Sequence, residues 1–442
     1  MYRRWIALFL LVAVLAAGCA KEKLPTEVAQ TPPAPALVTL KVGYRDAEHI
    51  GPLLDYLISA FQEEYPQYRV VRVKMKPLQS EAILQVHEGE LDVVPVLFAQ
   101  GRDQLLQPLD PFIRRDNLDL SGFRMDPVQF RWDGELYEMP YSGLPHLLVG
   151  NRTHFEAAGV AWPAEGWTWE QFRETAARLT RGDGESRVWG LSAQVVEQSI
   201  LTWLQQRVGG PEWTAGEVEV AEAFQFFGQL MERDRSVPHV EPAKSGSYRP
   251  ILYPVNRSKS PPPVPEVAVE MGSLGRAGIE EPWAVLPMPV LPGAHPVLRA
   301  KPFTLGIAAE AAEPEAAWEF IKFATGPKGA RVVAAAGSLP AYRSPEAEAL
   351  WQQGQPAALR YLAQLRWHSD SWYLSTTDSE YEHHSFLRKA IGKAVTRQTA
   401  WDQAAEEMFK GIERSHVVHG RAPLKKVVED LKEFEKSLNS KP

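Results

Sequence analysis

The chain has 442 residues, a formal net charge of −7 and a single cysteine. Because single hydrophobic cores stop growing at about 250–300 residues, this length predicts two folded units. The acidic balance excludes nucleic acid as an expected partner. One cysteine excludes an internal disulfide and a thiolate metal cluster.

Residues 1–18 have the pattern of an export signal. Arg3 and Arg4 precede an apolar run of 13 residues. The run is shorter than the ~20 residues that cross a bilayer as a helix, so it predicts a cleaved segment rather than a permanent anchor. Residues 15–19, Leu-Ala-Ala-Gly-Cys, resemble the bacterial lipobox. This resemblance implies cleavage before Cys19 and a lipid on its thiol, which would hold the chain on the extracytoplasmic face of the cell membrane.

Residues 19–36 are polar and rich in proline, with almost nothing to bury, so they predict an extended tether between lipid and domain. Removal of residues 1–18 takes away two arginines and no acid. The mature chain then has 46 basic and 55 acidic residues, a net charge of −9. An ordinary secretory signal followed by a chance cysteine is the alternative interpretation of this end.

The folded part is expected to begin with alternating strands and helices. Alternating apolar residues predict strands at 37–44 and 71–75, and an apolar run at 91–97 predicts a strand that is buried on both faces. Apolar residues at helical spacing predict helices at 53–65 and 80–87 between these strands. This order predicts a parallel sheet with right-handed crossovers.

Ligands of such sheets bind beyond the carboxyl ends of the strands. Tyr44 and Arg45 follow the first predicted strand, and Phe98 and Gln100 follow the third. These four residues are therefore candidates for ligand contact.

Three local patterns mark the middle of the chain. Asp133-Gly134 separates two strand-like runs and predicts a hairpin. Thr168 and Gln171 have the spacing of a capping box at the start of a helix that ends near residue 180, and Trp167 with Phe172 has that of a hydrophobic staple. A proline-rich stretch at 248–265 predicts a surface loop.

The remaining elements are expected in the second half of the chain. Alternating or apolar runs predict strands at 267–271, 283–288 and 303–308. Pro314 begins a predicted helix that ends at Gly326. Amphipathic helices are expected at 385–415 and 423–438.

The order of five segments resembles the extracellular solute-binding proteins of ABC importers, in their carbohydrate-type branch. Each segment alone is a weak signal, but their order and spacing from residue 37 to about 345 are specific. The segments are Phe61–Pro66; Leu91–Val94 with Leu109–Ile113; Asp133–Pro140; Asn151–Phe155 with Ala158–Val160 and Trp167–Phe172; and Ala316–Phe323.

The resemblance implies an α/β fold of type II, with two lobes of mostly parallel sheet flanked by helices and joined by hinge strands. Lobe one would comprise residues 37–143 and 303–345, and lobe two residues 146–300 and 350–442. The chain would cross between them near residues 141–146, near Phe303 and near residues 341–344. A monomer is expected to close on a small solute, most simply a sugar or oligosaccharide, and present it to the transmembrane subunits of an ABC permease.

Two positions depart from the pattern of these relatives. Many carry Gly-Ser-Trp before the strand equivalent to 283–288, whereas here Leu274 stands in place of the Trp. Relatives also often place an aromatic residue where this chain has Tyr381-Glu382-His383-His384. Leu274 and the proline-rich loop favour an alternative in which the fold serves as a surface sensor or assembly factor without a transported ligand.

A sugar site combines flat aromatic faces with planar charged or amide groups. Besides the four strand-end residues, the candidates by position are Tyr141, Trp283, Trp372, Tyr373 and His383. Ordinary packing is an alternative role for each of them.

The sequence predicts neither a cofactor nor a metal site. The adjacent His383 and His384 would point about 100° apart on a helix, so both rarely reach one ion. Nucleophile-elbow and zinc-protease motifs are missing, so no catalytic residue is expected. A lipid-anchored hydrolase with two carboxylates about 5–9 Å apart is the remaining enzyme alternative.

Overall fold

The computed structural model describes residues 37–45, 51–96, 102–125, 127–240, 266–273, 281–355, 357–365, 367–369 and 378–415, with the single residues 429 and 432. The export signal, Cys19, the tether, the proline-rich stretch and most of the predicted helix at 423–438 lie outside these residues. Within them, no helix is both long and apolar enough to cross a membrane.

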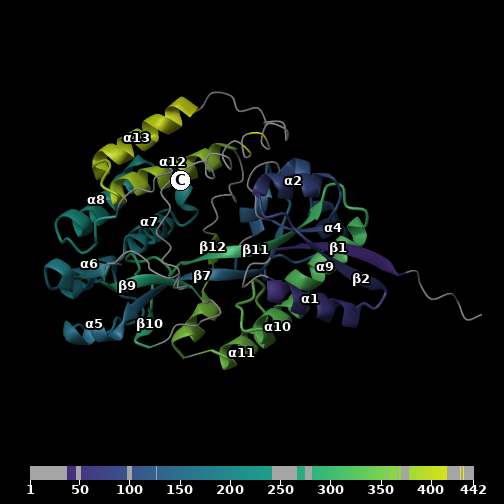
Figure 1. Cartoon of the computed structure of the whole chain (residues 1–442), viewed down its shortest axis with the longest axis horizontal. Helices are drawn as coiled ribbons and strands as arrows, with labels where there is room; N and C mark the ends of the chain where they lie inside the picture. Colours follow the sequence, from purple (N-terminus) through teal and green to yellow (C-terminus); the bar gives the residue numbers. More distant parts are fainter. Residues whose placement is uncertain are drawn as a thin grey trace, which may run out of the picture. The chain divides into compact units, whose positions relative to one another are not determined.

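The first five elements follow the predicted order (Figure 1). They are β1 (Val38–Tyr44), α1 (Gly51–Glu64), β2 (Tyr68–Lys74), α2 (Gln79–His87) and β3 (Val93–Pro95). β1 pairs in parallel with β2 over its whole length and with β3 at Val42, so the predicted parallel arrangement is confirmed here. The expected apolar face of α1 is buried.

Short elements lead to the predicted hairpin. They are α3 (Arg102–Leu105), β4 (Leu106–Gln107), α4 (Asp110–Asp116), η1 (Pro127–Phe130), β5 (Arg131–Trp132) and β6 (Glu135–Leu136). The hairpin is confirmed, with positive φ at both turn residues, 50° at Asp133 and 84° at Gly134. Two positive φ angles are what a two-residue turn of this kind requires, which explains the Asp-Gly pair.

Two long strands run through the middle of the fold (Figure 1). These are β7 (Met139–Asn151) and β11 (Leu298–Ala308), which pair antiparallel through residues 139–145 of β7. β7 then pairs with β9 (Glu266–Ser273) and β10 (Trp283–Leu286), while β11 also pairs with β3, β4 and β12 (Trp367–Ser369). The sheet order is β2-β1-β3-β11-β7-β9-β8, where β8 is Val188–Leu191.

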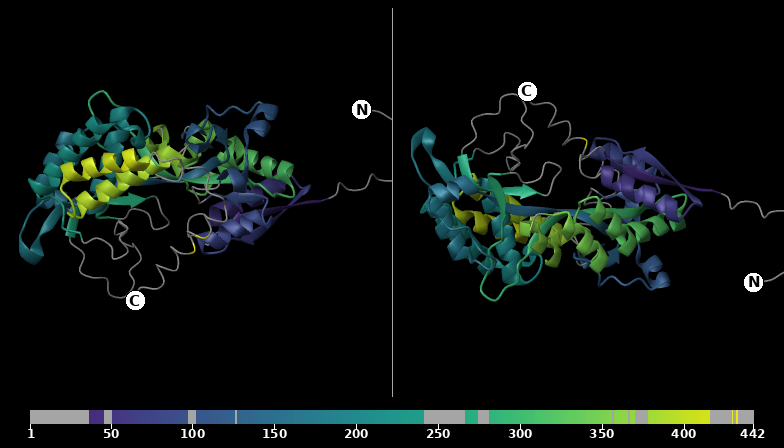
Figure 2. Two further views of the ribbon diagram at one scale, coloured as in Figure 1. Left: turned by 90° about the horizontal axis from the view of Figure 1, so that it is seen from above. Right: turned by 90° about the horizontal axis from the view of Figure 1, so that it is seen from below.

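The helices between β7 and β9 cover the part of the sheet that contains β8 and β9. They are α5 (Arg152–Ala157), α6 (Trp169–Leu179), η2 (Gly184–Ser186), α7 (Ala193–Val208), η3 (Glu212–Thr214) and α8 (Glu217–Glu232). After β11 come α9 (Pro314–Thr325), α10 (Pro327–Ala335), α11 (Pro345–Gln353), η4 (Ala357–Gln364), α12 (Asp378–Val395) and α13 (Trp401–Ser415). α12 packs on α7, and α13 packs on α8 (Figure 1 and Figure 2).

The apolar side chains form separate clusters along the sheet. The largest cluster gathers around Trp318 and Phe61, and a second gathers around Trp169 and Phe224. A smaller third cluster includes Ile83 of α2. β7 supplies side chains to both large clusters, which makes it the strand that they share.

The start of α6 follows the predicted capping chemistry. Thr168 Oγ1 accepts a hydrogen bond from Gln171 N at 3.2 Å, and Gln171 Oε1 accepts one from Thr168 N at 2.8 Å. The Trp167 and Phe172 rings lie with centroids 5.6 Å apart. Two backbone donors that the helix cannot satisfy are thereby paired, so the predicted capping box and staple are confirmed.

Thr168→Ala should lower the free energy of unfolding by about 1 kcal/mol because the capping oxygen is lost. Denaturant unfolding of purified protein measures this change. Thr175→Ala, the same substitution inside α6, is the matched control and should have little effect. Equal effects of the two substitutions would show that the cap adds nothing to stability.

Candidate functional site

Five of the nine predicted ligand residues lie in the described part of the chain: Tyr44, Arg45, Tyr141, Trp283 and His383. Phe98, Gln100, Trp372 and Tyr373 lie outside it, as do Cys19 and Leu274.

The two residues at the carboxyl end of β1 have different environments. The half-buried Tyr44 ring is covered by the Arg72 guanidinium of β2, whose Cζ lies 4.3 Å from the ring centroid. Arg45 is also half-buried, and within the described residues its buried Nε has no hydrogen-bond partner. Burial lowers the pKa of the Arg45 guanidinium below its ordinary value. Arg45 Nε is therefore a donor that no described residue satisfies, at the edge of the sheet where ligands of parallel strands bind.

Tyr141 is a core residue of β7. Its side chain is 1% exposed, and its ring centroid lies 6.2 Å from that of Phe303. Burial raises the pKa of the Tyr141 hydroxyl well above its usual range, and this hydroxyl has no hydrogen-bond partner among the described residues. In this conformation the Tyr141 ring packs in the protein core, on β7, the strand that supplies side chains to both large clusters.

Trp283 lies far from Tyr141 along the same strand. It begins β10 and pairs with Asn151, ten residues after Tyr141 on β7. At about 3.4 Å per residue, roughly 30 Å of strand separates the two positions. The structure therefore does not bring these two candidates into one small ligand site.

His383 lies beside a cluster of buried polar side chains that sequence reasoning missed. The cluster lies where α7, η3, β11 and α12 meet. Its members are Glu212 of η3 with its neighbours Gln205 of α7, Arg299 of β11 and His384 of α12, and the ion pair of Glu197 of α7 with Arg388 of α12. We call this set the polar cluster.

Arg299 and Glu212 form the centre of the polar cluster. Their residues are 2% and 0% exposed, and Arg299 Nη1 lies 3.2 Å from Glu212 Oε1. The other carboxylate oxygen of Glu212, Oε2, accepts a hydrogen bond of 2.6 Å from Gln205 Nε2. His384 Nδ1 lies 3.4 Å from Glu212 Oε1. Glu212 therefore holds together residues of three different elements.

The Glu212 carboxyl is kept ionised by its neighbours. Burial alone raises the pKa of Glu212, but the Arg299 guanidinium, His384 and the hydrogen bond from Gln205 together outweigh burial and hold it below its ordinary value of 4.5. A carboxylate that stays charged in the interior is a strong hydrogen-bond acceptor.

Several polar atoms of the cluster are buried without a hydrogen-bond partner in the described chain. They are Gln205 Oε1, Glu212 Oε1 and the three side-chain nitrogens of Arg299. Each unsatisfied buried group costs about 1–3 kcal/mol, so such groups are rare unless water or a ligand completes them. The polar cluster therefore has donors and acceptors that no described residue satisfies.

The sequence of α7 contains a pattern of polar residues that relates to this cluster. Gln198, Thr202 and Gln205 recur at the spacing of one helix face of α7. Such a polar stripe normally indicates a solvated face. All three residues are buried instead, because α12 and η3 cover them.

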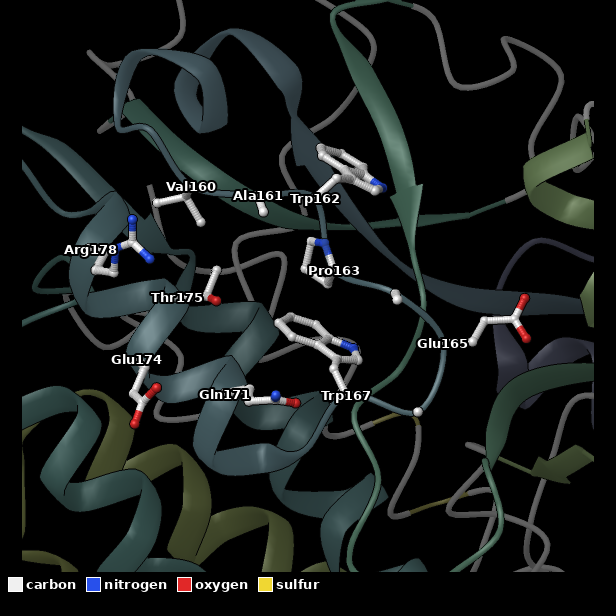
Figure 3. A pocket seen from close by; sticks show the side chains of 12 residues that line it. Val160, Ala161, Trp162, Pro163, Glu165, Trp167, Gln171, Glu174, Thr175 and Arg178 are labelled. Carbon is white, nitrogen blue, oxygen red and sulfur yellow. The ribbon is translucent and has the colours of Figure 1, made fainter.

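A surface pocket of about 410 Å³ lies elsewhere, between residues 160–167 and α6 (Figure 3). Trp162 and Trp167 line it. The Arg152 guanidinium lies 4.5 Å from the Trp162 ring centroid, and Trp167 Nε1 donates to Pro287 O at 2.8 Å. Both indoles are engaged in packing, and none of the predicted ligand residues lines this pocket, so we do not take it as the functional site.

Across the described residues, no group of three or more His, Cys, Asp and Glu side chains is placed to hold a metal ion.

The stability of the natural chain should depend on Glu212 at acid pH. A carboxyl with a depressed folded pKa contributes stability that is present above its unfolded pKa, near 4.5, and is lost as the pH falls through the folded value. The unfolding free energy of the natural chain should therefore fall more steeply below about pH 4.5 than that of Glu212→Gln.

Urea unfolding at a series of pH values measures these slopes. Glu174→Gln, which replaces an exposed carboxylate on α6, is the control and should keep the natural slope. If Glu212→Gln also keeps that slope, Glu212 does not hold the depressed pKa.

Comparison with known proteins identifies a family and solved structures to which this chain is similar. The model of the family described as bacterial extracellular solute-binding protein matches residues 47–331. Similar solved structures include a sugar transporter from Rhizobium etli in an open conformation, with 20% identity, a TM-score of 0.66, and coverage of 86% of this chain and 100% of that one.

Two further structures are similar. The Listeria monocytogenes ABC substrate-binding protein in complex with cycloalternan has 17% identity, a TM-score of 0.62, and coverage of 86% of this chain and 99% of that one. The Mycobacterium tuberculosis protein UgpB in complex with glycerophosphocholine has 16% identity, a TM-score of 0.60, and coverage of 89% and 99%.

These findings confirm the fold class and the family that the sequence predicted. Proteins of this family bind solutes outside the cytoplasm and are not enzymes. Because the family model matches more than half of its length, the chain belongs to the bacterial extracellular solute-binding protein family.

Proposed function

We propose that the protein captures a sugar or oligosaccharide between its two lobes and delivers it to the transmembrane subunits of an ABC permease. The observation that carries the choice of ligand is the polar cluster, where buried donors and acceptors have no hydrogen-bond partner among the described residues. Hydroxyl groups both donate and accept, so a sugar can complete both kinds of atom.

The chemistry of similar proteins supports this ligand class. The Listeria protein was solved with cycloalternan, and another similar structure, from T. maritima, with maltose. UgpB was solved with glycerophosphocholine, which carries a phosphate and a quaternary ammonium. In the polar cluster each buried carboxylate has a guanidinium partner, Arg299 for Glu212 and Arg388 for Glu197. This balance of charge favours an uncharged sugar over a charged solute.

The lobes of the proposal keep the boundaries that the sequence predicted, residues 37–143 with 303–345 and residues 146–300 with 350–442. The pairing of β7 supports a crossing near residues 141–146, because its partner changes from β11 to β9 between Pro145 and His146. A ligand that contacts both lobes stabilises the closed state by its greater affinity for that state.

The proposal includes a lipid on Cys19, a tether at 19–36 and a place on the outer face of the cell membrane. It is supported by the residues before Cys19 and by the extracellular nature of the family. Several acyl chains anchor a protein firmly, whereas one chain alone binds marginally.

Cys19→Ser should move the protein from the membrane fraction to the soluble fraction, because the lipid can no longer be attached. Cell fractionation and intact-mass measurement read this out. Cys19 is the only cysteine, so the substitution removes no other thiol. A variant that stays with the membrane at full length would show that the apolar run at 5–17 is itself the anchor.

A thermal-shift screen of the purified protein tests the ligand. The panel comprises neutral sugars, oligosaccharides, acidic sugars, amino acids, peptides and polyamines. A ligand at a hundred times its Kd adds about 2.7 kcal/mol of stability, which gives a clear rise in Tm. We expect that rise with one class of neutral sugar. A well-folded sample that responds to no compound would contradict the proposal and favour a sensor or assembly factor.

A further inference from the structure

Two arginines are buried among the described residues, and their surroundings differ. Arg124 is 1% exposed and each of its three side-chain nitrogens has an acceptor. Nε donates to Pro340 O at 3.1 Å, Nη1 donates to Ala363 O, and Nη2 donates to Glu348 Oε1 at 2.7 Å. This is how a protein interior usually accommodates a guanidinium, since every lost bond to water is replaced.

Arg299 is equally buried, but none of its three nitrogens has a hydrogen-bond acceptor in the described chain. Its one close acidic neighbour is Glu212, whose Oε1 lies 3.2 Å from Nη1 without the geometry of a hydrogen bond. A guanidinium has five N–H donors. Arg299 therefore has donors that no described residue satisfies.

Acceptors that receive no hydrogen bond from a described residue lie directly beside these Arg299 donors. Glu212 Oε1 and Gln205 Oε1 are buried without a donor, while Gln205 Nε2 holds the other Glu212 oxygen at 2.6 Å. A molecule that satisfies these atoms must accept hydrogen bonds from Arg299 and donate a hydrogen bond to Glu212. Hydroxyl groups do both, whereas an ionised carboxylate or phosphate only accepts.

The charges of Arg299 and Glu212 further restrict the class of ligand that can bind here. An anionic group next to Arg299 would also face the Glu212 carboxylate, and a cationic group next to Glu212 would face the guanidinium. Like charges at such short range in a buried site repel strongly. The second ion pair, Arg388 with Glu197 at 2.7 Å, adds no net charge.

Arg299 lies on β11, next to the region where β11 pairs with β7. Arg299 precedes Ala300, which pairs with Pro145 of β7 at the end of the β7–β11 pairing. Glu212 belongs to η3, and His384, 3.4 Å from Glu212, belongs to α12. A ligand here would contact the crossing strand and the helices of the second cluster together.

We propose that Arg299, Glu212 and Gln205 determine specificity by binding adjacent hydroxyl groups of an uncharged sugar and rejecting acidic sugars, an inference that rests on the proposed function. Arg299 and Glu212 act as a pair, in which the guanidinium donates to sugar oxygens and the carboxylate accepts from a sugar hydroxyl.

Isothermal titration calorimetry of the full mature protein tests the pair. The probes are maltose and mannobiose as neutral disaccharides, with digalacturonic acid as the acidic counterpart. The natural protein should bind a neutral probe at least tenfold more tightly than the acidic one. Arg299→Lys keeps the charge but loses the forked donors, and Glu212→Gln keeps the shape but loses the charge. Each should weaken binding of the neutral probe tenfold or more in samples that circular dichroism shows to be folded.

Arg124→Lys is the matched control. It removes a forked guanidinium that protein acceptors already satisfy, so it should lower Tm and leave affinity within twofold of the natural value. Natural affinity in both folded Arg299→Lys and Glu212→Gln would overturn the inference while leaving sugar capture intact. Tighter binding of digalacturonic acid would also overturn it. Failure of the natural protein to bind any sugar in the wider screen would instead overturn the proposed function.

A crystal structure of the natural protein with its bound neutral probe gives a readout that does not depend on how the variants fold. We expect sugar oxygens within about 3.2 Å of Arg299 nitrogens and of Glu212 Oε1. Ordered water at all of these atoms in the sugar-bound protein would overturn the inference, because the pair would then be part of the structure and not of the ligand site.

Discussion

The antiparallel pairing of β7 with β11 builds the largest hydrophobic cluster, and β7 continues beyond that pairing to supply Leu148 to the second cluster. Three prolines lie in the paired region: Pro140 opposite Thr304, Pro145 opposite Ala300, and Pro302 opposite Gly143. Proline cannot donate to a sheet, and the register also shifts between Phe303 and Thr304. Side-chain packing must therefore contribute much of the stabilisation that backbone hydrogen bonds contribute elsewhere in the sheet.

That packing is tight at Gly143. A Cβ on this residue would lie 2.8 Å from the Trp367 ring, closer than real Cβ atoms approach. Trp367 is 2% exposed and belongs to the largest cluster, so the absence of a side chain at Gly143 lets the indole lie against β7. Tyr141 fills the same cluster from two residues earlier on β7. The middle of the crossing is thus held by large rings packed against a strand with few donors.

The polar cluster lies at the other end of this pairing, and it differs from an ordinary core. Interiors usually satisfy their polar groups, as the surroundings of Arg124 illustrate. Around Arg299 the chain leaves donors and acceptors open, although it keeps each charge paired. A protein that binds a polar solute needs such a place, because a fully satisfied interior has no hydrogen bonds left for a ligand. In the proposed site, the affinity for a ligand and the free-energy cost of leaving these atoms unsatisfied would therefore have the same origin.

The sequence by itself determined the elements whose signals are local. Helical spacing of apolar residues predicted α1, the Asp133-Gly134 pair predicted the hairpin, and Thr168 with Gln171 predicted the start of α6. Each depends on residues within a turn or two of one another, where backbone geometry dictates which side chains meet. The order of such elements was also enough to indicate the family.

Only the tertiary structure decided which distant residues meet. Glu212, Arg299 and His384 come from three elements that lie more than eighty residues apart in sequence, and no periodicity links them. The distance of Trp283 from Tyr141 likewise depends on where β10 pairs along β7. Polar residues on one face of α7 predict exposure, yet the packing of α12 and η3 buries them. Burial and long-range contact are properties of the packed chain, because they depend on which surfaces cover each other and not on the spacing of residues along one element.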